Sequence, residues 1–196
     1  MTAEEFNYLH PASFWGRSTA DVGSFKFLDI KNLSIEARQG LKVSSKSFYR
    51  DNKWDFTAEL PDYPSYEVIL DFSKIRFSDG SNIVDLENKM FLDQVREFYF
   101  TLLVDPPSSY PKLTTWVTST RRCINSLFDY MKTNSILYLC DLDEGDLADF
   151  LDRISGQEKP QGGIITNRTL ATRSQGLDWL FEQGTKMSTG LIVNPF

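Results

Sequence analysis

Histidine is almost missing from this sequence, since His10 is the only one among 196 residues. One histidine leaves almost no material for a His-based metal site or for a histidine general base. The two cysteines, Cys123 and Cys140, are too few for a disulfide framework, and they do not form a CxxC pair. We expect both to be small buried thiols. The sequence therefore predicts no metal site and no cofactor.

Long apolar runs and a basic leader are missing as well. The longest apolar run is residues 98–104, far short of the roughly 20 residues that a membrane-spanning helix needs. The chain opens Met-Thr-Ala-Glu-Glu, with no basic start and no apolar stretch behind it, which is unlike a secretory signal. We expect a cytoplasmic protein that makes no contact with membranes.

Familiar catalytic motifs are also absent from the sequence. It contains no Gly-x-Ser-x-Gly, no phosphate-binding loop and no Cys/His couple. Pairs of carboxylates can be found anywhere in a chain with 27 acidic residues, so no pair stands out as a general acid and base. We predict no catalytic residue, and we interpret the chain as a binding part of something larger.

The net charge of −6 is unevenly distributed along the chain. Residues 112–135 hold four basic residues and one acidic residue, and residues 159–186 hold four and two. Residues 141–152 hold six acidic residues and no basic one. The spacing of these acids does not match a calcium loop, so we expect helix capping and a solvated face. A fold that separates the basic segments from the acidic one would make a two-faced molecule.

The hydrophobic pattern changes near residue 84 and predicts an α+β protein of two regions. Residues 1–83 form the strand-rich region, in which Glu67–Phe72 and Ile75–Phe77 are predicted strands and Asp79-Gly80 is a turn. Residues 84–196 form the mainly helical region. The first region is predicted to make a small sheet or hairpin that packs on the helices.

Four helices are predicted in the second region. The first begins after Asp85, and its core stripe is Leu86, Met90, Val95, Phe98 and Leu102. The others span about residues 113–132, 144–154 and 167–183. Their predicted end signals are a capping box of Asp143 and Asp146, an N-cap at Thr166, and Gly184 as the terminator.

Two polar helix faces are candidates for binding a phosphate backbone. The first lies on helix 113–132, where arginine charge is combined with small hydrogen-bonding side chains. Its residues are Thr115, Thr118, Arg121, Arg122, Asn125 and Lys132. The alternative interpretation is an ordinary solvated helix face.

The second candidate is the start of the last helix, where unpaired backbone N–H groups and the helix dipole favour an anion. Asparagine and arginine are also well suited to reading adenine and guanine edges in a major groove. The residues are Thr166, Asn167, Arg168, Thr169, Thr172 and Arg173. The alternative is a capped helix that carries two surface arginines.

Taken in order, the helical segments resemble the core-binding (SAM-like) domain of the tyrosine recombinases, the phage-integrase family. Residues 115–128 match its helix that opens with Thr and carries a basic pair before a Leu/Phe stripe. Residues 139–151 match its Asp-Leu helix, and Thr166-Asn-Arg-Thr-Leu-Ala-Thr-Arg173 matches its closing helix. Asn194-Pro195 matches the Asn-Pro that leads into the catalytic domain of that family.

The resemblance implies a domain that clasps one face of double-stranded DNA. The family's catalytic set includes a His-x-x-Arg, which cannot be written here because His10 is the only histidine. It also implies a parent protein that transfers DNA strands through a phosphotyrosine intermediate, without metal or cofactor, with several recombinase protomers acting together. Phosphates would be neutralised by Arg121, Arg122, Arg168 and Arg173, and Asn167, Thr169 and Thr172 would lie nearest the base edges.

Two other functions remain open at the level of sequence. The first is a protein-interaction module that binds no DNA and holds a partner through its phenylalanine-rich surface or its acidic helix. The second is a free-standing enzyme whose site is assembled from scattered carboxylates.

Overall fold

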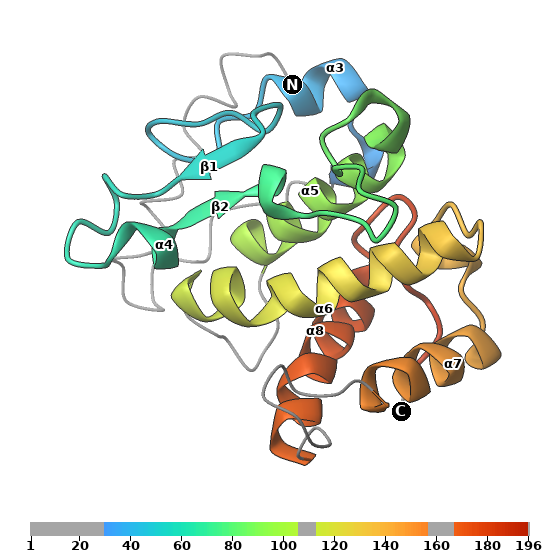
Figure 1. Ribbon diagram of the computed structural model, residues 1–196. Coiled ribbons are helices and arrows are strands. Elements are labelled where there is room, and N and C mark those ends of the chain that lie inside the picture. The colour runs from blue at the N-terminus through green and yellow to red at the C-terminus, as the bar shows by residue number, and fades with distance from the viewer. Residues whose placement is uncertain (1–29, 106–112, 157–166, 196) are drawn as a thin grey trace.

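The chain folds into a mainly helical α+β structure with one small sheet (Figure 1). The computed structural model describes residues 30–105, 113–156 and 167–195. The predicted α+β class is confirmed at this level. Among the described residues, none of the helices is long and apolar enough to cross a membrane.

Described residues 30–83 contain less strand than the predicted strand-rich region would have. The sheet has two antiparallel strands of three residues each, β1 (Lys53–Asp55) and β2 (Ile69–Asp71), with Trp54 opposite Leu70. The other elements of this region are the short helices η2 (Ile30–Asn32), α3 (Ile35–Gln39), α4 (Ser65–Val68) and η3 (Phe72–Lys74).

Both predicted strands of this region need correction. Glu67 and Val68 belong to α4, which follows Pro64, and only Ile69–Asp71 is extended. Ile75–Phe77 makes one isolated bridge, between Arg76 and Asn82, although Ile75 and Phe77 are buried and Arg76 is exposed as the alternation predicts. The predicted turn after it is confirmed, with Gly80 at φ +88°.

Short polar side chains explain why the strands are so few. Asp55, Asp71 and Asp79 each accept hydrogen bonds from the backbone N–H and the hydroxyl of the residue two positions later. Such local bonds satisfy the backbone in turns, where a sheet ladder would otherwise do so.

The centre of the fold is α5 (Lys89–Val104), which follows the short helix η4 (Leu86–Asn88). It is buried on almost every side along residues 91–103, polar positions included. The predicted stripe is therefore only partly right. Val95, Phe98 and Leu102 are buried, but Leu86 is 88% exposed and Met90 is 38% exposed. The tighter turn of η4 changes the helical phase ahead of α5, so these two side chains point to solvent.

The remaining helices match the sequence prediction closely. They are α6 (Leu113–Thr133), η5 (Leu139–Asp141), α7 (Glu144–Ser155) and α8 (Asn167–Gly184). The predicted core residues of α6 that the structure describes are all buried, from Leu113 to Met131. α6 and α8 pack so closely that a Cβ placed on Gly176 would lie 2.7 Å from the Cβ of Cys123.

One cluster of buried apolar side chains runs through the described part of the chain, from Ile30 to Leu191. Aromatic contacts link the two predicted regions within it. The ring centroids are 5.2 Å apart for Trp54 and Phe72, and 6.2 Å apart for Phe72 and Tyr99 of α5. The predicted boundary near residue 84 thus falls within a shared core, and a division into two domains stays a prediction.

Polar contacts join the beginning and the end of the described chain. Lys31 donates to the carbonyl oxygen of Thr185 (3.1 Å), and Arg38 donates to the hydroxyl of Ser188 (2.7 Å). Arg38 and Ser188 also meet at Glu97 of α5, whose Oε1 lies 3.3 Å from Arg38 and accepts from the N–H (2.8 Å) and hydroxyl (2.7 Å) of Ser188. α3, α5 and the segment after α8 are therefore held together at one buried carboxylate.

Candidate nucleic-acid interface

The outer face of α6 carries two neighbouring arginines. Arg122 is exposed on the side of α6 opposite its buried residues, whereas Arg121 is half-buried at the edge of that buried side. Neither guanidinium has a hydrogen bond or ion pair with any group in the described part of the chain. The predicted outward position is confirmed for Arg122 and holds only in part for Arg121, and neither charge is neutralised within the described structure.

Six other cationic side chains of the described structure are paired with carboxylates. Their carboxylate partners lie between 2.6 and 4.0 Å away. The pairs are Arg38–Glu97, Lys74–Asp71, Arg96–Asp93, Lys132–Asp79, Arg153–Asp129 and Lys186–Asp105. A carboxylate partner neutralises the positive charge that would otherwise attract a phosphate. Arg121 and Arg122 differ from these residues because they have no such partner.

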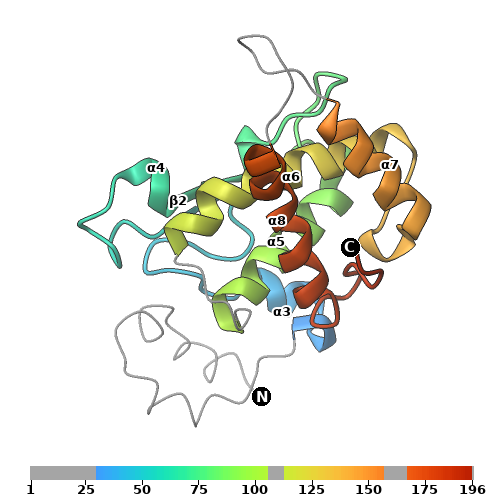
Figure 2. The same ribbon diagram turned by 90° about the horizontal axis from the view of Figure 1, so that it is seen from below.

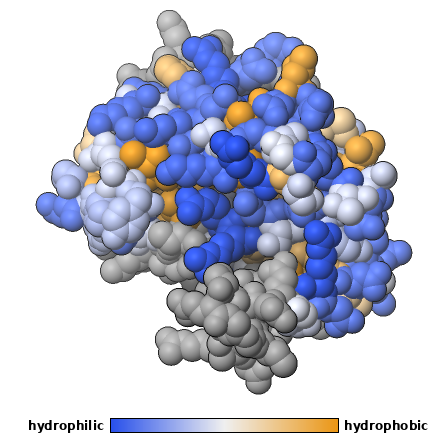
Figure 3. Space-filling view, in the orientation of Figure 1, coloured by the Kyte–Doolittle hydropathy of each residue, from blue (hydrophilic) through white to orange (hydrophobic). Residues whose placement is uncertain are grey.

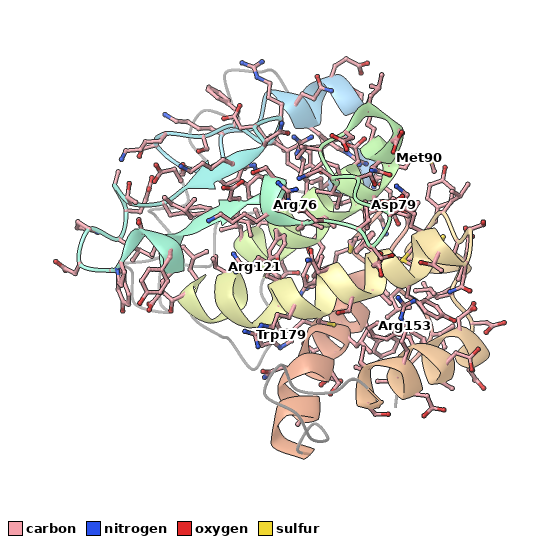
Figure 4. All side chains as sticks on the ribbon, in the orientation of Figure 1. Arg76, Asp79, Met90, Arg121, Arg153 and Trp179 are labelled. Carbon is pink, nitrogen blue, oxygen red and sulfur yellow. The ribbon has the colours of Figure 1, made fainter. Side chains whose placement is uncertain are left out.

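A third arginine, Arg76, lies on the same face of the molecule (Figure 4). Ser78 donates from its N–H (2.7 Å) and its hydroxyl (2.8 Å) to Asp129 of α6, which fixes the loop along the helix. Arg76 is exposed, and its guanidinium has no hydrogen bond or ion pair within the described residues. We did not single it out from the sequence, although its place between buried Ile75 and Phe77 already indicated an outward position.

Lys132 differs from the other predicted residues, because its ammonium group is engaged within the chain. It lies 2.8 Å from Asp79, 3.7 Å from Glu87 and 4.8 Å from the ring centroid of Phe77, and it donates to Ser81 (2.6 Å). We leave it out of the candidate interface, because a phosphate would have to displace these partners.

Asp79 reports directly on this role of Lys132. Hydrogen bonds from Lys132 and Ser81 lower the pKa of Asp79 to about 2. We expect an NMR titration of the Asp79 carboxyl to give a midpoint near that value, and Lys132→Met to return it toward 3.8, the ordinary value. A depressed pKa favours the folded state above the unfolded-state pKa, and this contribution disappears as the pH falls through the folded-state pKa. An unchanged midpoint in Lys132→Met would contradict the internal role.

The remaining predicted contacts are placed only in part. Asn125 is half-buried, and its Oδ1 is buried without a hydrogen-bond partner in the described part of the chain. Thr115 and Thr118 belong to α6, but their side chains lie outside the described residues. Thr166 lies outside them altogether. The backbone of α8 begins at Asn167 as predicted, and the structure does not describe the side chains of Asn167, Arg168, Thr169, Thr172 and Arg173.

The acidic segment lies at the other end of α6, in α7. Its predicted capping box is confirmed, since Asp143 and Asp146 each accept from the backbone N–H of the other at 2.8 and 3.1 Å. Arg153 ties α7 to Asp129 at 3.0 Å. In Figure 4, Arg153 lies well away from Arg121. The described residues contain no cluster of three or more histidine, cysteine or acidic side chains able to hold a metal ion.

The cysteines are structural in character. Both thiols are free, Cys123 is buried as predicted, and Cys140 is only half-buried. Burial raises the pKa of Cys123 to about 12, so its reactive thiolate form is suppressed.

Comparison with known proteins gives no relative. No protein-family model, no curated protein and no solved structure matches this chain.

Proposed function

We propose that this chain binds double-stranded DNA through the outer face of α6 and the first turns of α8. The observation that carries the proposal is the state of Arg121 and Arg122, which are half-buried and exposed, respectively, and have no hydrogen bond or ion pair within the described structure. Unpaired surface arginines attract phosphates, and their charge-assisted bonds to phosphate oxygens position a protein on a duplex.

The arrangement of the two helices supports a common surface. Figures 1 and 2 together place the outer side of α6 and the beginning of α8 on one side of the molecule, with α3 on the opposite side. The face shown in Figure 3 is mostly hydrophilic. Arg76 would add a third positive charge to this surface.

We further propose that the helices from α5 to α8 form a SAM-like core-binding domain of a tyrosine recombinase. The support is the order of the sequence segments in α6, α7 and α8 that resemble that family. In this proposal the chain holds DNA and does not cut it. Strand transfer would need the family's catalytic residues in the parent protein, and other recombinase protomers on the same DNA would be its protein partners.

The test is a fluorescence-anisotropy titration with duplex DNA at several salt concentrations. The slope of log affinity against log salt is about −0.9 for each phosphate neutralised, so binding by a handful of cations should weaken by orders of magnitude between about 50 and 200 mM salt. Changing Arg121 and Arg122 together to Glu should make the slope shallower by about two and raise Kd at least about tenfold.

The matched control changes Arg50 and Lys89 to Glu, because both are exposed and neither is paired with a carboxylate in the described structure. This variant has the same net charge as the double arginine variant, so a similar loss from both would indicate only a general charge effect. Absence of binding at about 50 mM salt would overturn the proposal and favour the protein-interaction module.

A further inference from the structure

Four large apolar side chains are exposed together near the beginning of α5 and the end of α6. They are Leu86, Met90, Leu137 and Tyr138, with 88%, 38%, 50% and 37% of their surface exposed. In Figure 3, apolar surface appears at the upper right of the view, where Figure 4 places Met90. Single exposed apolar residues are ordinary, but a contiguous group marks an interaction site. We call these four residues the apolar patch.

Gln94 fixes the two halves of the apolar patch beside each other. Its Nε2 donates to the carbonyl oxygens of Met90 (3.1 Å) and Leu137 (2.9 Å), and its Oε1 accepts from the N–H of Leu139 (2.9 Å). Gln94 itself is buried at 3% exposure. The segment after α6 is thereby held against α5, so the apolar patch is part of the fixed fold.

The rim of the apolar patch is strongly acidic. Segments 85–93 and 137–144 carry six carboxylates, against Lys89 as the one basic residue in them. The carboxylates are Asp85, Glu87, Asp93, Asp141, Asp143 and Glu144, of which all but half-buried Asp93 are exposed. Two of them have cationic partners, since Glu87 lies 3.7 Å from Lys132 and Asp93 lies 3.7 Å from Arg96. The other four form no ion pair within the described residues, so the rim keeps an excess of negative charge.

This charge decides which partner fits. Nucleic acid and anionic membrane surfaces would be repelled by the rim. A symmetric dimer that placed two copies of the apolar patch face to face would also bring like charges together. The complementary surface is one that presents apolar side chains surrounded by lysine or arginine.

We propose that the apolar patch binds a basic amphipathic helix of a partner protein. Leucine-like side chains one turn apart would cover Leu86, Met90 and Leu137, and flanking lysines or arginines would meet the carboxylates. This site is separate from the proposed DNA surface, since Arg121 lies twelve residues, or roughly 18 Å of helix, before the end of α6.

The experiment uses the full chain and a labelled amphipathic peptide of about 14 leucine and lysine residues, roughly four helical turns. In an anisotropy titration, changing Leu86 and Leu137 to Ser should raise Kd at least about tenfold, because burial of two leucines is worth more than that factor. Both side chains are exposed, so the fold should tolerate the changes. NMR shifts on peptide binding should centre on residues 86–94 and 137–141.

The matched control changes Tyr66 and Ile192 to Ser, which are 68% and 63% exposed and lie outside the apolar patch. It should bind the leucine–lysine peptide like the unaltered chain, and a leucine–glutamate peptide should not bind. Equal binding by the Leu86/Leu137 variant, or binding of the leucine–glutamate peptide, would overturn the proposal. If sedimentation showed that the unaltered chain self-associates and that the Leu86/Leu137 variant does not, the occupant of the apolar patch would be a second copy of this chain. The DNA titration of the same variant should be unchanged, which keeps the two proposals distinguishable.

Discussion

Replacing Glu97 with alanine is expected to lower the free energy of unfolding by about 3–5 kcal/mol. Glu97 is 2% exposed and accepts hydrogen bonds from both the N–H and the hydroxyl of Ser188, while Arg38 lies 3.3 Å away. Removing the carboxylate takes away the ion pair of Arg38, whose side chain is 14% exposed, and leaves the N–H of Ser188 without its acceptor. Both losses cost free energy at a buried site. Urea unfolding monitored by circular dichroism measures the effect.

Asp93→Ala is the matched control, one helical turn earlier on α5. Its carboxylate is 43% exposed and lies 3.7 Å from Arg96, which keeps its hydrogen bonds to the carbonyl oxygen of Arg50 and the side chain of Asn52. The loss of this longer contact should therefore cost clearly less free energy than the change at Glu97. If the two variants were equally stable, the junction at Glu97 would not hold the fold together.

Gly184→Ala is expected to destabilise the protein by at least about 3 kcal/mol. A Cβ at Gly184 would collide with the carbonyl group of Leu191, and a Cβ at Gly190 would collide with the backbone of Gly184. Both obstacles are backbone atoms, which cannot rotate away as a side chain does, so the segment after α8 would have to lift from the helix. Thermal unfolding followed by calorimetry tests this.

Gly40→Ala provides the comparison, because a Cβ there would meet its nearest heavy atom at 3.7 Å and the backbone φ is −80°. We expect this variant to keep its stability or gain up to about 1 kcal/mol, since alanine restricts the unfolded chain. A similar melting temperature for both alanine variants would show that the contact between Gly184 and Leu191 can relax.

The sequence predicted the outer helices well and the central one poorly. α6, α7 and α8 each have one solvent-exposed face, so the helical period of the sequence separates their core residues from their surface residues. α5 is buried around its circumference. In the sequence Gln94, Arg96 and Glu97 resemble a solvent-exposed polar face, but in the structure they are buried against hydrogen-bonding partners. Those partners are Leu139, Asn52 and Ser188, all more than 40 positions away. No local pattern indicates such contacts.

In the candidate interface, too, the sequence predicted what depends on the helical period and missed what depends on distant contacts. The exposed position of Arg122 follows from the period of α6 alone, and the same period puts Arg121 at the edge of the buried side. Lys132 occupies a similar position in that period, but Asp79 and Glu87 reach it from a distant loop and from η4. Arg76 joins the face only because Ser78 anchors its loop to Asp129. Tertiary contacts therefore take Lys132 out of the candidate interface and bring in Arg76, which was not predicted from the sequence.

The contacts between Lys31 and Thr185 and between Arg38 and Ser188 join the first and the last described segments of the chain. The segment that enters the core, at residues 31–38, therefore lies beside the segment that leaves it, at residues 185–188. In Figures 1 and 2 this junction lies on the side of the molecule opposite the outer face of α6. Flanking domains attached at these points would be tethered next to each other, and domain insertion is tolerated with this geometry. The arginine-bearing surface would then stay clear of its own neighbours.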